Sequence, residues 1–488
     1  MRITNGMMIK NSLSNINTNK QLMSIYENQQ ATEKKIIRPS DDPVIAIRAL
    51  KYRTTLNEIS QYVDKNIPDA ESWISTTEGA LQNISSVFTD ILQYCNQGST
   101  DSFQTDNKQS IIDTLQKLKD TVYAEGNVDF AGRYVFSGYK TDKTLIFPAD
   151  TKQKYSITQN FKGSNIEKET YTVNKVDVEN IEDVSAKTPD GKNVYVIKLA
   201  YNETEDNIAL KIDGNNVTLA TPTGNQNAYE TVLDAAGASI AYDKTYGQLV
   251  MNEEAYKQYI SSNDIEVVYE KTGFNKGEVR PEHYFKCADI TANPADIDDP
   301  ANKKYNEETA SQDIYYNINY GQSIKVNTQA NESIDIYIGR TLQDMQNTLA
   351  QLKTAEEKVS KIQGMIDSKT YSEEDVAKLK TMLEAANMEV DYAKKNMQSV
   401  FSGSITKMKD YQKTVELAIS ELGARDTRLS LVKSRIEEQK NNIKELQSKN
   451  EDVELEDAVI NLSQAQVVYN ASLNAAAKIV QQSLIDFI

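Results

Sequence analysis

Residues 56–94 of this chain are LNEISQYVDKNIPDAESWISTTEGALQNISSVFTDILQY, and this stretch decides the fold. Apolar or small residues recur in it in alternating steps of three and four, which places them on one face of a continuous helix. The positions are Ile59, Val63, Asn66, Ala70, Trp73, Thr77, Ala80, Ile84, Val87, Ile91 and Tyr94. A stripe this narrow buries little alone, so the spacing predicts that another helix packs along it, with Trp73 as a packing residue.

Two further stripes lie near the other end of the chain. The first consists of Val415, Ala418, Leu422, Arg425, Leu429, Val432, Ile436, Gln439, Ile443 and Leu446. The second consists of Leu455, Val459, Leu462, Tyr469, Leu473, Ala476, Val480 and Leu484. We therefore expect the two ends of the chain to provide partner helices for each other.

The composition indicates an acidic, soluble protein. The 488 residues carry a formal net charge of -17, 39% of them are hydrophobic, and the mean hydropathy is -0.58. This balance argues against nucleic acid as a partner, because binding phosphates requires clustered Lys and Arg. No stretch approaches the ~20 apolar residues of a membrane span. Residues 1–10 lack the apolar segment of a secretory signal peptide, so any export is expected to use another route.

Residues suited to catalysis or metal binding are scarce. The two cysteines, Cys95 and Cys287, fall in different predicted elements, and a disulfide between them is not expected. Together with the single histidine, His283, they cannot form a structural zinc site of four Cys or His ligands. A Cys/His nucleophile pair is formally possible, but we interpret His283 as a surface residue of a Tyr-rich β segment. The sequence therefore predicts no enzyme, no cofactor and no metal.

One acidic loop resembles a calcium-binding pattern. Asp296, Asp298 and Glu307 fall at its first, third and twelfth positions. However, Pro300 and Ala301 occupy the fifth and sixth positions, where the pattern requires an oxygen ligand and a glycine. We interpret the segment as a solvated acidic loop.

The N-terminal arm is expected to span residues 1–138. Its terminal helix, residues 1–36, carries a weak stripe and is not expected to be stable unless it is packed. Long helices should follow over residues 43–126, with Asp42 as N-cap and Pro43 in the first turn. Pro68 removes a backbone donor, which predicts a kink or a short break near Ile67.

Residues 139–333 form short β-type runs, and we expect one or two β-rich outer domains there. Residues 208–212 and 217–219 should pair as a hairpin across residues 213–216, DGNN. The C-terminal helical arm, residues 334–488, should restart at a capping box of Ser372 and Asp375 and end in a terminal helix over about residues 453–488. The predicted fold class is α+β and elongated, with the long terminal helices paired as a coiled-coil-like bundle around a β-rich middle.

Several short motifs resemble one protein family. Residues 38–43 (RPSDDP), 66–70 (NIPDA) and 77–81 (TEGAL) are similar to the N-terminal region shared by bacterial flagellins and hook-filament junction proteins, which form one superfamily. Residues 132–138 (GRYVFSG) resemble the junction proteins, where flagellins usually carry a TQFNG-like sequence. Residues 318–327, 422–425, 451–458 and 483–488 are also similar to the junction proteins. The chain is longer than usual for that family, in the β region and around residues 345–405.

The resemblance implies a structural protein of the bacterial flagellum, located outside the cell at the hook-filament junction. It implies export by the flagellar type III apparatus with an export chaperone. A ring of copies would then connect the hook-side junction protein to flagellin, with neither nucleic acid nor membrane as a partner. Marginal terminal helices fit this role, because they can be disordered during export and become ordered on assembly.

We expect the assembly interface to lie on the terminal helices. Its residues are predicted to be Ile9, Leu13, Ile16, Met23, Leu462, Tyr469, Leu473, Ala476, Val480 and Leu484. Two alternatives stay open at this point. One is a filament flagellin, and the other is a coiled-coil surface adhesin, suggested by the 27 tyrosines and the turn-rich middle region.

Overall fold

The computed structural model describes residues 5–100, 105–179, 188–222, 226–234, 237–305, 312–368 and 370–485. The chain divides into two compact units. The first unit comprises Met1–Glu71, Tyr316–Ile324 and Thr427–Ile488, and the second comprises Ser72–Tyr315 and Lys325–Asp426. The sequence-based division after residues 138 and 333 stays a prediction.

The first unit is mainly helical. It contains helix α1 (Asn5–Thr32), helix α2 (Pro43–Gln61) and helix α10 (Leu455–Ile485), together with the last part of helix α9 (Glu373–Glu451). The carboxylate of Asp42 accepts hydrogen bonds from the amides of Val44 and Ile45, at 2.9 and 3.1 Å, and Pro43 opens α2. The predicted cap and first-turn proline are therefore confirmed. Strands β13 (Tyr315–Asn319) and β14 (Gln322–Lys325) pair with each other.

The predicted break near Pro68 is present as a π-helical turn. Residues Tyr62–Asn66 adopt this turn between α2 and helix α3 (Ile67–Ser99). The Ile67 amide donates to the Tyr62 carbonyl, one residue further back than in an α-helix. Since Pro68 has no N–H to donate, the extra residue in the turn accommodates the missing hydrogen bond without ending the helical path.

The helices of the second unit bury most residues of their stripes. They are α3, helix α4 (Thr105–Glu125), helix α8 (Tyr337–Asp367) and the first part of α9. Trp73, the predicted packing residue, has no exposed surface, and its ring meets Phe130 edge-on with centroids 5.9 Å apart. At the start of α9 the Asp375 amide donates to Ser372 Oγ at 3.2 Å, as predicted. The Asp375 carboxylate accepts from the Ser372 hydroxyl at 2.7 Å.

The β-rich part of the second unit contains two larger antiparallel sheets. The six-stranded sheet has the order β12-β11-β3-β10-β6-β7 and the four-stranded sheet the order β4-β5-β9-β8. Their strands are β3 (Thr151–Phe161), β4 (Glu167–Val173), β5 (Asp190–Lys198), β6 (Ile208–Ile212), β7 (Asn215–Val217), β8 (Ile240–Asp243), β9 (Gln248–Met251), β10 (Ile265–Phe274), β11 (Lys286–Asp289) and β12 (Lys303–Tyr305). A small pair, β1 (Asp129–Phe130) and β2 (Arg133–Tyr134), precedes them. The short helices α5 (Ala228–Leu233) and α6 (Glu253–Tyr259) lie between strands, and α7 (Ala330–Ser333) precedes α8. The α+β fold class is thus confirmed.

Two local predictions were wrong. The predicted β6–β7 hairpin is present, but its loop is Asp213 and Gly214 rather than residues 213–216, because Ile212 pairs directly with Asn215. Both turn residues have positive φ, 48° and 80°, as a two-residue type I′ turn requires. His283 lies in a short 3₁₀-helix and is buried, because the backbone turn at Pro281 directs it inward. Glu307 of the acidic loop lies outside the described residues.

Candidate assembly interface

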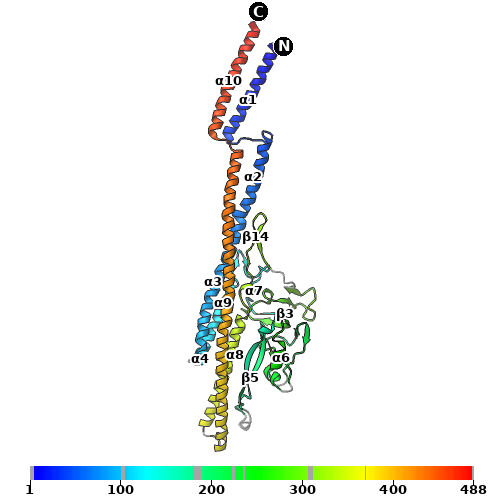
Figure 1. Cartoon of the computed structure of the whole chain (residues 1–488), viewed down its shortest axis with the longest axis vertical. Coiled ribbons are helices and arrows are strands. Elements are labelled where there is room, and N and C mark those ends of the chain that lie inside the picture. Colours follow the sequence, from blue (N-terminus) through cyan, green and yellow to red (C-terminus); the bar gives the residue numbers. More distant parts are fainter. Residues whose placement is uncertain are drawn as a thin grey trace. The chain divides into compact units, whose positions relative to one another are not determined.

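Helices α1 and α10 lie side by side and run in opposite directions (Figure 1). Residues at three- and four-residue steps on each helix are shielded between them, and we refer to this line of contact as the α1–α10 seam. On α1 they are Ile9, Ser12, Ile16, Asn19, Met23 and Tyr26, and on α10 they are Ala458, Leu462, Ala465, Tyr469, Ser472 and Ala476. All except Ala458 are only half-buried. The seam therefore holds the two helices together, and its side chains keep a smaller part of their surface in contact with water.

A second set of apolar side chains lies outside the seam, and we refer to them as the outer apolar residues. On α1 they are Met7, Met8, Leu13, Leu22 and Ile25, and on α10 they are Leu455, Val459, Ile460, Val467, Val468 and Leu473. Their exposed fractions run from 38% for Met8 to 68% for Val467. This many exposed large apolar side chains on one pair of helices are typical of a surface that another molecule covers.

The predicted interface residues divide between these two sets. Six of them lie in the seam: Ile9, Ile16, Met23, Leu462, Tyr469 and Ala476. Leu13 and Leu473 are outer apolar residues, 56% and 41% exposed. Val480 and Leu484 belong to α10, but their side chains lie outside the described residues. The assembly role of the whole set stays a prediction.

Sequence reasoning missed most of the outer apolar residues. It followed a single heptad stripe on each helix, whereas Leu22, Ile25, Val467 and Val468 fall one or two positions beside that stripe. The sequence did contain a signal for these exposed residues, because apolar side chains lie on both sides of each heptad stripe. A single partner helix covers only one face of a helix, so some of them must stay uncovered in the pair.

The segments that follow α1 and precede α10 are held together by backbone hydrogen bonds and by two ion pairs, and we refer to these contacts as the lock. The backbone of Lys35 donates to the Glu451 carbonyl at 2.7 Å, and Val453 donates to the Glu33 carbonyl at 3.0 Å. The Arg53 guanidinium holds the Glu451 carboxylate with two hydrogen bonds, one of them 3.1 Å between Nε and Oε1. Lys34 pairs with Asp452.

These contacts lower the pKa of both carboxyl groups. The pKa of Glu451 lies below its usual range mainly because of the hydrogen bond from Arg53. The pKa of Asp452 is lowered mainly by the hydrogen bond from Lys34. The lock is therefore an ionic contact that holds near neutral pH and weakens as the carboxylates take up protons.

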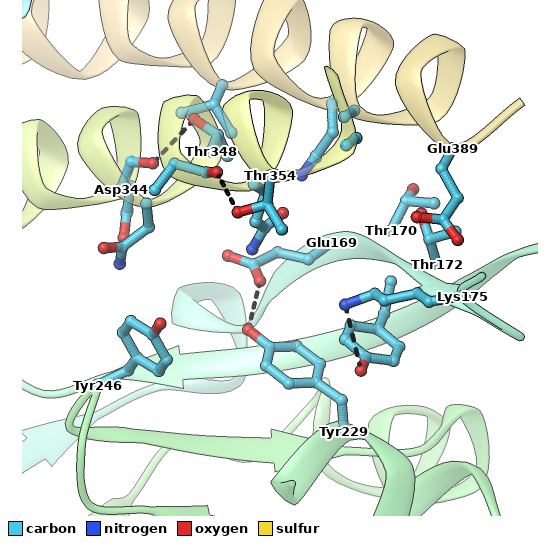
Figure 2. A pocket seen from close by; sticks show the side chains of 18 of the residues that line it. Glu169, Thr170, Thr172, Lys175, Tyr229, Tyr246, Asp344, Thr348, Thr354 and Glu389 are labelled. Atoms are coloured by element: carbon cyan, nitrogen blue, oxygen red, sulfur yellow. Dashed lines mark hydrogen bonds between the residues drawn. The ribbon is translucent and has the colours of Figure 1, made fainter. Parts of the chain in front are cut away.

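Figure 2 shows a cavity of about 410 Å³ in the second unit, between β4 and helices α8 and α9. Glu169 and Asp344 each form an ion pair with Lys198, at 2.7 Å. Glu389 accepts from Lys358 at 3.0 Å and from the backbone amide of Val176. Because these carboxylates are already paired, the arrangement favours packing of the sheet on the helices over acid–base chemistry.

The cysteines and the histidine do not form a reactive pair. Cys95 and Cys287 are free and buried. Burial raises the pKa of Cys95 to about 12 and raises that of Cys287 as well, so both thiols stay protonated at neutral pH. Burial also lowers the pKa of His283 to about 4, and its Nε2 lies 3.0 Å from the Thr144 carbonyl oxygen. Among the described residues there is no cluster of three or more potential metal ligands.

None of the described helices combines the length and the apolar character that a membrane crossing requires.

Two family models match the helical ends of the chain. The bacterial flagellin N-terminal helical region matches residues 3–141, which include α1 to α4 and the β1–β2 pair. The bacterial flagellin C-terminal helical region matches residues 405–488, the later part of α9 and all of α10. The chain thus carries both helical regions of bacterial flagellins, one at each end. Both helices of the α1–α10 pair are thus flagellin-type terminal segments.

Curated relatives align with a third to a half of this chain. Flagellar hook-associated protein 3 of Escherichia coli (strain K12) is 27% identical over 251 residues, 50% of this chain and 73% of the relative. The protein of the same name from Salmonella typhimurium is 27% identical over 282 residues, 51% of this chain and 86% of the relative. A flagellin of Clostridium tyrobutyricum is 26% identical over 168 residues, 33% of this chain and 44% of the relative.

Solved structures of flagellar proteins are similar as well. A flagellar hook-associated protein from Vibrio parahaemolyticus aligns with a TM-score of 0.37 and 13% identity, over 84% of this chain and 100% of that chain. The flagellar junction protein from Legionella pneumophila aligns with a TM-score of 0.31 and 13% identity, over 84% and 100% of the two chains.

Proposed function

We propose that this chain is a structural junction protein of the bacterial flagellum, in which a ring of copies connects the hook side to the flagellin filament. The observation that carries the proposal is the α1–α10 pair, in which flagellin-type terminal helices leave the outer apolar residues uncovered. Copies of such a pair can cover each other's outer residues when they pack around a ring. Contacts of this head-to-tail kind use two different surfaces and can continue into a polymer.

The curated relatives favour a junction protein over a filament flagellin. Relatives named flagellar hook-associated protein 3 align over half of the chain, whereas the flagellin aligns over a third. The GRYVFSG motif at residues 132–138 supports the same choice. We propose the hook-side junction protein, flagellin and further copies of this chain as partners outside the cell. An export chaperone and the type III export apparatus would act before assembly.

The half-buried seam supports export in an unfolded state. A helix pair that buries little apolar surface is only marginally stable, because folding must offset the loss of chain entropy. Such ends can remain disordered until neighbouring copies add apolar contacts. We propose no catalytic activity, since the carboxylates of the cavity in Figure 2 are paired and the thiols are protonated.

Immunogold labelling of isolated hook-filament preparations tests the proposal. The labels are counted at the hook's distal end and along the filament, with a strain that lacks this chain as the control for background. A band confined to the distal end of the hook is the expected result. Label distributed along the filament would instead indicate a flagellin, and label on the cell surface away from flagella would support the adhesin alternative.

A further inference from the structure

Helix α2 carries a row of exposed apolar side chains on the face that its packing leaves uncovered. Val44, Ile47 and Leu50 recur at three-residue steps and are 57%, 67% and 62% exposed. The opposite face of the helix buries Ala46 and Ala49. Large apolar side chains exposed side by side on one helix are typical of a surface that a partner covers.

The same face of α2 is basic. Arg48 and Lys51 are exposed and lie one helical turn beyond Val44 and Ile47. The acidic residue of α2, Glu58, comes two turns later, near the end of the helix. We refer to Val44, Ile47, Arg48, Leu50 and Lys51 as the outer face of α2. It is apolar and basic, on a chain whose formal net charge is -17.

The acidic residues just before α2 do not neutralise this face, because backbone amides already engage them. Asp41 Oδ2 accepts from the amide of Arg38 at 2.8 Å. Asp42 caps the helix through the amides of Val44 and Ile45. The positive charge of the outer face is therefore available to a partner.

The start of α10 has the complementary character. Glu456 and Asp457 lie in its first turn and are exposed. Ile460 follows one turn later, on the side opposite the seam, and is 53% exposed. The first basic residue of α10 is Lys478, far along the helix. The outer side of the start of α10 is therefore apolar and acidic.

We propose that the outer face of α2 binds the start of α10 of a second copy of this chain. The contact rests on the proposed ring of copies and names two of the surfaces that meet in it. Ile460 would be covered by the apolar side chains of α2, while Glu456 and Asp457 pair with Arg48 and Lys51. Such complementary potentials select the partner and fix its orientation.

Charge also determines the symmetry of this contact. Two outer faces of α2 are both basic and repel each other, and two α10 starts are both acidic, so neither surface can pair with its own copy. The contact is therefore heterologous, which is the kind that continues from copy to copy around a ring. Each helix face is short, and a stable complex usually buries about 1,200 Å² or more. We therefore expect this contact to form in the assembly, where other contacts support it, and not between two isolated chains.

Cysteine crosslinking between two differently substituted chains tests the contact directly. One chain carries Ile47→Cys, the other carries Ile460→Cys and an affinity tag, and a strain that lacks the native chain expresses both. The native thiols, Cys95 and Cys287, are buried. Mild oxidation of hook-filament preparations should give a dimer that contains both chains. Ile47→Cys combined with Asn474→Cys, an exposed position further along α10, is the matched control and should give at least several-fold less.

Charge reversal tests the electrostatic part. Arg48→Glu with Lys51→Glu should lower incorporation into flagella on the order of tenfold, because carboxylates would then face carboxylates. Adding Glu456→Lys and Asp457→Lys to the same chain restores opposite charges between neighbouring copies and should recover incorporation. Lysines at the start of a helix are unfavourable for its dipole, so recovery could not come from a more stable α10. Chain secreted into the medium measures export, which should not change.

A dimer of the two chains, together with recovery by the fourfold variant, would establish the contact. Three results would overturn it while leaving the flagellar role intact: no dimer above the control in preparations that contain both chains, normal incorporation after charge reversal on α2, or a loss that the α10 changes do not recover. The last result would mean that a different protein covers α2. Absence of the chains from hook-filament preparations would overturn the proposed function as well.

Discussion

The α1–α10 pair and the helical core of the second unit have the same heptad spacing but very different burial. In the core, Trp73, Ile84, Phe88 and Ile91 of α3 have no exposed surface. In the pair, the equivalent seam positions are half-buried, and apolar residues beside them remain exposed. The spacing thus determines which face of a helix is packed, while the number of neighbouring helices determines how completely it is buried.

The neighbours of each region explain the difference. Helix α3 meets α9, where Gln412 donates to the Ser85 carbonyl at 3.3 Å, and α4 packs against α8. In the first unit, α1 and α10 pack against each other. Polar residues such as Asn19 and Ser472 in the seam reduce the apolar contact further. The pair is therefore the region whose stability should depend most on other copies of the chain.

Truncating a core residue should have the largest effect on stability. Phe88→Ala removes a fully buried ring from the second unit and should lower the free energy of unfolding by about 3–5 kcal/mol. Met23→Ala in the half-buried seam is the matched comparison and should cost about 1 kcal/mol. Denaturant unfolding of the full chain, followed by circular dichroism, gives both values. Equal losses for the two variants would contradict the difference between the regions.

The helices and the residues along their seam could be predicted from the sequence, whereas the exposed surfaces beside the seam could not. The cap at Asp42 and the break at Pro68 follow from local chemistry, so they could be predicted. The burial of His283 could not be predicted, because it depends on a backbone turn and on the distant Thr144 carbonyl. The exposure of Ile25 likewise depends on how few helices pack against α1.

A smaller loss is expected from the ionic contact that attaches the four-stranded sheet to α8. Burial lowers the pKa of Lys198, but Glu169, Asp344 and Glu167 together raise it above its ordinary value. Lys198→Met leaves these carboxylates without their shared cation and should cost about 3 kcal/mol near neutral pH. Since unpaired carboxylates take up protons more readily, the loss should shrink as the pH is lowered towards 5. A loss that is independent of pH would indicate a packing effect instead.

The lock at the base of the α1–α10 pair should contribute less, and its contribution should depend on pH. Because the pKa of Glu451 is lowered in the folded chain, its stabilising effect is present above the unfolded value of about 4.3 and is lost as the pH falls through the folded value. Between pH 7 and pH 3 we expect NMR signals of the pair to broaden before those of the second unit. Glu451→Gln should weaken the pair already at pH 7 and flatten this pH dependence. If the NMR signals of Glu451→Gln broaden over the same pH range as those of the wild type, the pH effect does not come from Glu451.

Changes to the outer apolar residues should have the smallest effect on the isolated chain and the clearest effect on assembly. Ile25 and Val467 are 49% and 68% exposed, so Ile25→Glu with Val467→Glu should leave the unfolding temperature within about 1 °C of the wild type. The control carries Asn28→Glu with Asn474→Glu, which adds the same charge at exposed polar positions of the same two helices.

Incorporation into flagella separates the two double variants. In a strain that lacks the native chain, the control should restore filaments, whereas the Ile25 and Val467 variant should be exported but not retained. The reason is that two buried glutamates would face apolar surface of the neighbouring copy without a partner. Normal incorporation of this variant would mean that the outer apolar residues face solvent in the assembled ring. The contacts between copies would then have to come from surfaces other than the exposed sides of α1 and α10.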